Sequence, residues 1–187
     1  MATLPILVGI TVWAIPRLDR LAAVDRTGAV TLADGDSLVL AGERVRLRGL
    51  DAPEFGQSCR RDGQDYACGR SARAELARLI GKSAVTCTGW ERDKYNRLLA
   101  RCTAGGIDLN RALVKNGWAV SYGDYAAEEA DARAARRGLW AGEFDRPSAW
   151  RAVHGAAHED EHTFAIAIWN AIREFLGRTQ TEGPRAQ

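Results

Sequence analysis

A chain of 187 residues with 46% hydrophobic and 27% charged side chains is long enough for one domain with appendages and can bury an ordinary core. A net charge of +2 permits nucleic-acid binding but is too small to argue for it. The sequence excludes several classes: it has no P-loop, no dinucleotide fingerprint and no zinc-ribbon C-x2-C pair, and its three histidines all lie beyond residue 153, which leaves no Ser/His/Asp triad.

The chain begins with an uncharged, largely apolar segment over residues 1–16. Its length suits a signal peptide and is short for a spanning helix, which needs about 20 apolar residues. Arg17 and Arg20 follow the segment and no basic residue precedes it, which is opposite to the positive-inside rule. We predict that residues 1–23 are a signal peptide or a membrane anchor and that the protein is exported, to the periplasm or outside the cell, or membrane-anchored. The alternative is a hydrophobic arm packed on the domain.

Short strands and tight turns follow a predicted linker over residues 17–27. We expect strands over residues 29–33, 37–40 and 43–50. In the third of these, apolar residues alternate with arginines, so the arginines share one face of the strand. They are Arg44, Arg46 and Arg48. The alternative is an edge strand whose arginines face solvent.

Helices and a hairpin complete the predicted domain. Residues 71–80 are expected to form a helix that stops at Gly81, and residues 84–90 and 98–102 a hairpin. Asp108 is expected to cap a helix to about residue 115, and residues 125–137 to form another. This order predicts a β-rich α+β fold, a five-stranded OB-type barrel with about three helices, over residues 24–150.

Four cysteines are spaced as two local pairs. Cys59 and Cys68 bracket a polar loop, and Cys87 and Cys102 flank the predicted hairpin turn nearly symmetrically. We predict two disulfides, each stabilising the fold by roughly 3 kcal/mol in the chain-entropy picture. The alternative is four buried free thiols in a cytosolic protein.

Residues 151–187 are expected to be a C-terminal extension. Its histidines, His154, His158 and His162, share one face if the segment is helical, which predicts either a zinc site or a solvated helix start. An apolar stripe predicts an amphipathic helix that docks on the domain, on a partner or on a membrane. The stripe is Ala165, Ile168, Trp169, Ile172, Phe175 and Leu176. Residues 178–187 are expected to be disordered.

An ordered set of acidic and basic residues at predicted strand ends is the most informative feature of the chain. It comprises Asp34-Gly35-Asp36, Arg46, Asp51-Ala52-Pro53-Glu54 and Asp93-Lys94-Tyr95-Asn96-Arg97. Cleavage of a phosphodiester needs a cation, a base for water and donors for the developing charge. This set contains candidates for all three.

Each member of the set has a predicted role. Asp36 and Asp51 are the predicted ligands of Ca²⁺, or of Mg²⁺ with more retained waters. Glu54 is the predicted base, or orients the attacking water; the alternative is a surface loop residue. Arg46 and Arg97 are predicted phosphate clamps, with salt bridges on the barrel as the alternative.

Two neighbours of these residues have supporting roles in the prediction. Asp34 is expected to fix its turn and to add negative charge around the metal. Tyr95 is expected to be structural, packing on the hairpin.

In these motifs the chain resembles the staphylococcal-nuclease-like (thermonuclease) family, over about residues 28–150. Further matching segments are Gly69-Arg70-Ser71-Ala72, Asp108-Leu109-Asn110, Gly117-Trp118-Ala119 and Gly138-Leu139-Trp140. The resemblance implies a five-stranded OB barrel and a calcium-dependent, sugar-nonspecific nuclease.

The resemblance also implies roles for single residues. The backbone carbonyl of Ala52 would be a third metal ligand, although the family usually has Thr here and the hydroxyl is missing. Arg97 would assist departure of the 5′ oxygen and leave 3′-phosphate ends. Lys94 would contact phosphate. Tyr122 and Tyr125 would stack on or hydrogen-bond the terminal nucleotide, with surface or core positions as the alternative.

We therefore predict a monomeric, disulfide-containing nuclease that cuts DNA and RNA and prefers single-stranded or frayed substrate. One rival is a catalytically silent OB module that binds nucleic acid or protein in the cell envelope. Another is an envelope protein whose C-terminal helix recruits a partner. The complete acidic and basic set favours the nuclease, because a silent module has no chemical reason to keep all its members together.

Overall fold

The computed structural model describes residues 23–28 and 30–154. The apolar N-terminal segment, the amphipathic helix, His158 and His162 lie outside these residues, and what the sequence predicts for them stays a prediction. The chain divides after Pro147 into two compact units. Residues 147–154 are helical, and His154 stacks on Trp150 with ring centroids 4.5 Å apart. Within the described residues, no helix has both the length and the apolar character needed to cross a membrane.

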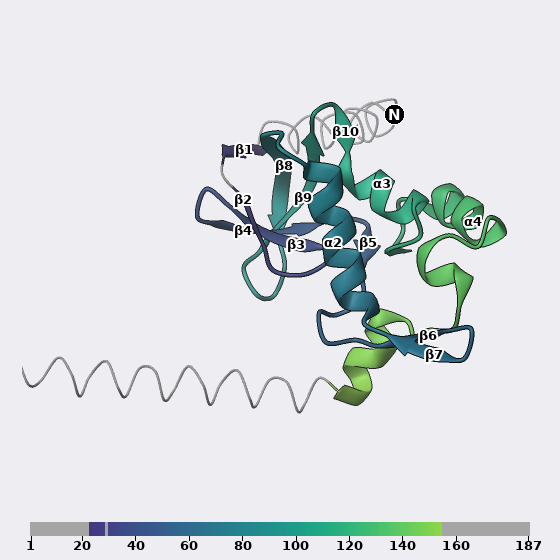
Figure 1. Ribbon diagram of the computed structural model, residues 1–187. Helices are drawn as coiled ribbons and strands as arrows, with labels where there is room; N and C mark the ends of the chain where they lie inside the picture. The colour runs from purple at the N-terminus through teal and green to yellow at the C-terminus, as the bar shows by residue number, and fades with distance from the viewer. Residues whose placement is uncertain (1–22, 29, 155–187) are drawn as a thin grey trace, which may run out of the picture. The chain divides into compact units, whose positions relative to one another are not determined.

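A large curled sheet is the framework of the first unit (Figure 1). Its strands are β1 (Val24–Gly28), β2 (Val30–Leu32), β3 (Ser37–Leu40), β4 (Glu43–Leu47), β8 (Val85–Arg92), β9 (Leu98–Ala104) and β10 (Ile107–Asp108). They lie in the order β1-β8-β9-β4-β3-β2, with β10 paired to β9. All neighbours are antiparallel except β4 and β9, which are parallel. A curled, mixed sheet agrees with the predicted OB-like order.

The sheet has seven strands where the sequence predicted five in the domain. One added strand is β1, in a segment predicted to be a linker. Its sequence, VDRTG, lacks the apolar alternation of a half-buried strand. It forms because β8 supplies an antiparallel partner, with Val24 opposite Gly89 and Gly28 opposite Val85.

Two smaller strand pairs flank the sheet. β5 (Leu50–Asp51) pairs with β11 (Val120–Ser121), and β6 (Cys59–Arg61) pairs with β7 (Gln64–Tyr66). The segment between Cys59 and Cys68, predicted to be a loop, is therefore a hairpin. The predicted strand over residues 43–50 breaks at residues 48–49, where Gly49 has a φ of 80°, and its end becomes β5.

The helices within residues 30–147 are α2 (Cys68–Ile80), α3 (Leu109–Lys115), α4 (Ala126–Ala134) and the 3₁₀ helix η1 (Gly138–Ala141). α2 begins three residues before the predicted start and ends before Gly81, as predicted. Asp108 caps α3 by accepting the N–H of Arg111, also as predicted. α4 is shorter than predicted because the backbone leaves the helix after Ala134, and Arg136 has a φ of 51°.

One face of α2 closes the core against the curled sheet (Figure 1). Ala72 and Leu76 of α2 belong to the same buried cluster as Val45 and Leu47 of β4. The alternation predicted for β4 is confirmed, because its apolar residues point into this cluster while Arg44 is exposed and Arg46 half-buried.

Both predicted disulfides are present. Cys59–Cys68 joins the start of β6 to the start of α2, with Cα atoms 5.6 Å apart. Cys87–Cys102 joins directly opposed residues of β8 and β9, with Cα atoms 4.1 Å apart. No described cysteine is free.

A fully buried amide joins the sheet to α3. Nδ2 of Asn110 donates to the carbonyls of Arg48 (2.9 Å) and Ala100 (3.1 Å), and Oδ1 accepts the N–H of Cys102 (2.9 Å). The Ala100 carbonyl also accepts the N–H of Arg48, whereas the Arg48 carbonyl and the Cys102 N–H depend on the Asn110 amide for the bonds described here.

We predict that Asn110→Ala lowers the free energy of unfolding by about 3 kcal/mol, because it removes the partner of two backbone groups, the Arg48 carbonyl and the Cys102 N–H. Urea denaturation measures the loss. Asn116→Ala is the matched control: Nδ2 of Asn116 donates one bond, to Glu75, in a partly buried position. Equal losses in the two variants would contradict the role given to Asn110.

Candidate active site

The turn after β2 brings the first acidic residues into position. Oδ1 of Asp34 accepts the backbone N–H of Asp36 (3.1 Å) and the hydroxyl of Ser37 (2.7 Å), a geometry by which Asp closes turns. Gly35 is needed there, since a Cβ would lie 2.8 Å from that of Ala72 and 2.9 Å from that of Ala52. Asp34 therefore fixes the turn, as the sequence predicted.

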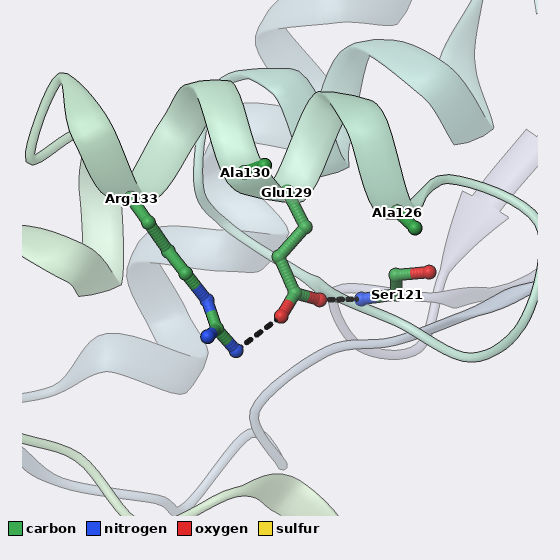
Figure 2. Close-up of a pocket in the computed structure, with 5 residues that line it drawn as sticks. All are labelled: Ser121, Ala126, Glu129, Ala130 and Arg133. Atoms are coloured by element: carbon green, nitrogen blue, oxygen red, sulfur yellow. Dashed lines mark hydrogen bonds and ion pairs between the residues drawn. The ribbon is translucent and has the colours of Figure 1, made fainter.

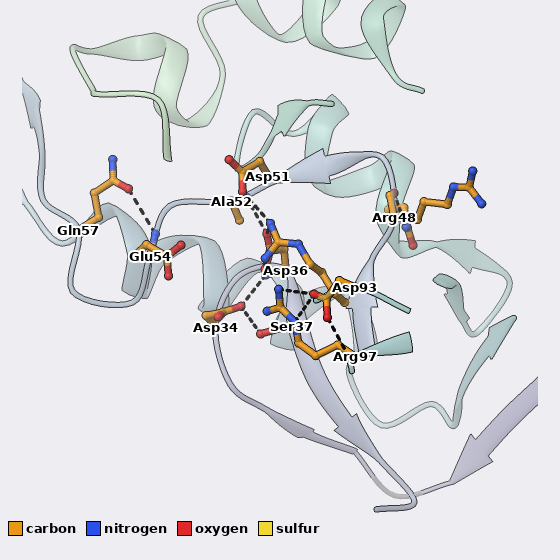
Figure 3. A network of polar contacts seen from close by, with 12 residues as sticks. Asp34, Asp36, Ser37, Arg48, Asp51, Ala52, Glu54, Gln57, Asp93 and Arg97 are labelled. Atoms are coloured by element: carbon orange, nitrogen blue, oxygen red, sulfur yellow. Dashed lines mark hydrogen bonds and ion pairs between the residues drawn. The ribbon is translucent and has the colours of Figure 1, made fainter. Parts of the chain in front are cut away.

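Arg46 joins two carboxylates from different segments (Figure 3). Its Nη1 donates to Oδ1 of Asp36 at 3.2 Å, and its Nη2 lies 2.8 Å from Oδ2 of Asp36 and 2.7 Å from Oδ1 of Asp51. Strand register explains the meeting: Ser37 pairs with Arg46 across β3 and β4, and Asp51 pairs with Val120 of β11. The structure thus brings together three of the predicted site residues.

Asp36 is nearly inaccessible, with 3% of its surface exposed. Burial raises the pKa of this carboxyl well above its usual range, and the negative charges of Asp34 and Asp51 act in the same direction. Arg46 and the backbone N–H of Ala52, which donates to Oδ2 at 3.1 Å, oppose that rise in the pKa. The carboxylates are therefore crowded together at an electrostatic cost, which a bound cation would relieve.

Glu54 lies at the edge of this cluster, on the loop after β5 (Figure 3). It is half-buried. Gln57 holds the loop: the Glu54 N–H donates to its Oε1 (3.3 Å), and the Gln57 N–H donates to the Glu54 carbonyl (2.8 Å). The Nε2 of Gln57 continues to the carbonyl of Asp145 at 2.8 Å.

The sequence did not single out Gln57, which is fully buried. A lone glutamine in a polar loop gives no periodic or compositional signal of burial. Gly69 was noted only as part of a helix entry, yet it too shapes the loop. A Cβ there would lie 1.7 Å from the Glu54 carbonyl oxygen, so the first turn of α2 packs directly under the loop that carries Glu54.

Arg97 is held by Asp93 at the hairpin between β8 and β9. Its Nε lies 2.7 Å and its Nη2 2.6 Å from Oδ2 of Asp93. Burial alone would raise the pKa of Asp93, but the hydrogen bonds from Arg97 and Tyr95 hold it below its usual range. The parallel register sets Arg97 one residue before the Val45–Leu98 pair. The hairpin is therefore alongside the strand that carries Arg46, with the Arg97 guanidinium engaged by Asp93.

The residues predicted to contact substrate differ in exposure. Lys94 is exposed, with its Nζ 4.8 Å from the ring centroid of Tyr95. Tyr95 lies against Lys94 and Arg97 of the same hairpin, as expected, and 47% of its surface is exposed. Tyr122 is 81% exposed, whereas Tyr125 is 2% exposed and belongs to the core. A base can therefore reach Tyr122 but not Tyr125, for which the core alternative holds.

A pocket on α4 is separate from these residues (Figure 2). It is lined by Ser121, Ala126, Glu129, Ala130 and Arg133. Buried Glu129 accepts the N–H of Ser121 and pairs with Arg133 and Arg146. These contacts account for Glu129 as a structural anchor, and no predicted site residue lines the pocket.

The carboxylate cluster fits a hard cation. Asp36 and Asp51 are 3% and 5% exposed and converge on one positive group. In the part of the chain that the structure describes, no group of three or more His, Cys, Asp or Glu is arranged to hold a metal. The two carboxylates, which both contact Arg46, are oxygen donors of the kind that Ca²⁺ accepts.

A family model described as "Staphylococcal nuclease homologue" matches residues 44–142, more than half of the chain. The chain belongs to the staphylococcal nuclease family. The match contains Arg46, Asp51, Glu54 and Arg97, and the family predicted from the motifs is confirmed.

The chain is similar to two relatives that are named as nucleases and to one that is named for another process. The chain is 31% identical over 148 residues to the probable staphylococcal-like nuclease CAN2 of Oryza sativa subsp. japonica, covering 75% of this chain and 38% of that protein. It is 32% identical over 122 residues to an uncharacterized endonuclease of Escherichia coli O157:H7, covering 59% and 74%. It is 37% identical over 127 residues to the succinoglycan biosynthesis protein ExoI of Rhizobium meliloti (strain 1021), covering 64% and 66%.

In metal-free protein, we expect the raised pKa of Asp36 to make stability fall as pH rises. The unfolded carboxyl titrates near its ordinary value of 3.8, so the contribution is fully present below that pH and is lost as the pH passes through the higher folded-state pKa. Asp36→Asn removes this loss. The free energy of unfolding of Asp36→Asn relative to that of the wild type, measured in urea with EDTA, should therefore increase between about pH 4 and pH 7.

The matched control is Asp65→Asn, because the Asp65 side chain is 78% exposed. Its free energy of unfolding should follow the wild type across the same pH range. A difference between Asp36→Asn and the wild type that does not vary with pH would contradict the assignment.

We predict that Gly69→Ala displaces the Glu54 loop and lowers the free energy of unfolding by about 1–3 kcal/mol, the usual cost of overpacking. Urea denaturation is the measurement. The control is Gly56→Ala in the same loop, where an added Cβ meets nothing within 4 Å and the change should stay within about 0.5 kcal/mol. The packing argument fails if both variants behave alike.

Proposed function

We propose that this chain is a nuclease that hydrolyses phosphodiester bonds in DNA and RNA with a bound divalent cation, Ca²⁺ in preference to Mg²⁺. Membership of the staphylococcal nuclease family and the naming of the rice and Escherichia coli relatives as nucleases support nuclease chemistry. The observation that carries the proposal is the convergence of Asp36 and Asp51 on Arg46. In the proposal the two carboxylates bind the cation and Arg46 binds phosphate, and the contacts among these three side chains support it.

In this proposal the cation supplies charge neutralisation and an acidified water. Arg46 contacts both carboxylates in this structure. When a cation neutralises those carboxylates, the Arg46 guanidinium can bind phosphate oxygens in their place. Glu54 accepts the proton of the attacking water, and Arg97 stabilises charge on the departing 5′ oxygen, so that 3′-phosphate ends remain. Arg97 must release Asp93 to do so, at least in part.

The conditions of action are further parts of the proposal. Two disulfides support an oxidising compartment, as an exported or membrane-anchored protein would meet. We propose a monomer. The Rhizobium relative is named for succinoglycan biosynthesis, and that name gives no role to the residues of the site.

The competing function is a catalytically silent module that binds nucleic acid or protein. Two observations favour it: Ala52 lacks the hydroxyl of the Thr usual in the family, and Arg46 engages both carboxylates. The same residues therefore permit a site that binds without cutting, and a cleavage assay separates the two functions.

We predict Ca²⁺-dependent cleavage of labelled single-stranded DNA and RNA by the oxidised full chain, and its loss in EDTA. Glu54→Gln should lower the rate by about 10²- to 10⁴-fold, the usual contribution of a general base. Glu143→Gln, which changes an exposed carboxylate elsewhere, should leave the rate unchanged. Folded protein that binds but never cuts would establish the silent module instead.

A further inference from the structure

Trp90 is a large aromatic side chain that the fold leaves outside its core. It is 41% exposed. The pairing of β8 with β9 shifts register between Gly89 and Glu91, so Trp90 sits in a bulge. Gly89 makes the bulge possible, because a Cβ there would lie 2.4 Å from the Leu99 carbonyl oxygen. Bulges re-aim side chains. Here Trp90 keeps the outward position of the β8 alternation, and Glu91 after it is exposed as well, where the alternation would bury it.

Arg48 holds the exposed indole in place. Its guanidinium carbon lies 4.7 Å from the Trp90 ring centroid, within the range of a cation–π contact. Its Nη1 also lies 3.4 Å from Oε2 of Glu91. The Arg48 backbone is fixed, since its N–H donates to Ala100 and its carbonyl accepts from Asn110. Trp90, Arg48 and Glu91, which we name the indole platform, are therefore an ordered surface.

The indole platform continues the face that carries the candidate site. Arg48 follows Arg46 by two positions, at the turn where β4 ends. Leu99 of β9 pairs with Arg46 on one side and with Glu91 on the other. Figure 3 draws Arg48 on the opposite side of the Asp36 and Asp51 cluster from Glu54. The platform thus lies beyond Arg46 as seen from the predicted base.

We propose that the indole platform is a base-stacking subsite, in which Trp90 stacks on an unpaired nucleobase of a single strand whose phosphate is held at Arg46. The inference rests on the proposed nuclease function. Arg48 covers one face of the indole and Glu91 offsets its charge, so the base would stack on the other face of the partly exposed ring. Stacking on a ring face tolerates every base, and it requires a base that is free of its duplex partner.

This subsite gives the candidate nuclease a physical reason to prefer single-stranded substrate. A base within a duplex must leave its stack and its partner before it can reach Trp90, at a cost of a few kcal/mol. A single strand meets the platform at no such cost. The preference comes from Trp90 and is separate from the cleavage chemistry at Glu54.

The test compares full-length variants on single-stranded oligonucleotides, with KM and kcat from cleavage and affinity from fluorescence anisotropy of the Glu54→Gln protein. Trp90→Ala should raise KM and weaken binding by roughly fivefold to a hundredfold with little change in kcat. Trp90→Phe keeps a ring and should retain most of the affinity. Ile107→Ala removes another exposed apolar side chain, 43% exposed on β10, and should change nothing.

An abasic scan locates the stacked base. A set of oligonucleotides, each with one base removed, is tested for binding to the protein that retains Trp90. Removal of the base at a single position beside the cleaved bond should weaken binding. That penalty should disappear in Trp90→Ala. Identical profiles for the two proteins, or equal behaviour of Trp90→Ala and Ile107→Ala, would overturn the subsite while leaving the nuclease intact. A wild type that neither cuts nor binds would overturn both proposals together.

Discussion

The site depends on one guanidinium. Asp36 comes from the turn after β2 and Asp51 from β5, and two carboxylates this close repel each other when little water separates them. Arg46 offsets part of that repulsion and joins the two segments by direct contact with both carboxylates. Strand register brings the three charges together: Ser37 lies opposite Arg46, and Asp51 lies opposite Val120. The contact of Arg46 with the carboxylates therefore depends on this register. Removal of one partner leaves a buried charge uncompensated, which destabilises the fold by more than the ion pair stabilises it. Loss of any one of the three residues therefore affects the other two.

Around this contact the backbone is held by specific contacts, whereas three aromatic side chains are exposed to solvent. Gln57 and Gly69 hold the Glu54 loop from two sides, and Arg44 ties the hairpin to β4 through the Tyr95 carbonyl. Trp90, Tyr95 and Tyr122 remain exposed. Such a division suits a protein whose reacting groups must be placed precisely while its substrate varies in base sequence, because ring faces accept any base.

Sequence reasoning succeeded where short motifs coincide with strand ends. Asp36, Arg46 and Asp51 were placed together because turn residues, alternating apolar residues and carboxylates gave separate signals for the same region. It failed where a partner distant in sequence decides the structure. β1 lacks a pattern of its own and forms on β8. Gln57 is buried by contacts with Glu54 and Asp145 that no local pattern encodes. Tyr122 and Tyr125 look equivalent in the sequence, yet only one faces solvent.

The bond from Gln57 to Asp145 has a consequence for the order in which the protein is made. It joins residues 88 positions apart, and the backbone bridge between Arg60 and Glu143 closes beside it. While the chain is emerging from the ribosome, the Glu54 loop lacks these anchors until residue 145 has been added. An unfinished chain therefore holds every acidic and basic residue of the set without the support of the loop. The support of the Glu54 loop is therefore complete only once the whole domain has been made.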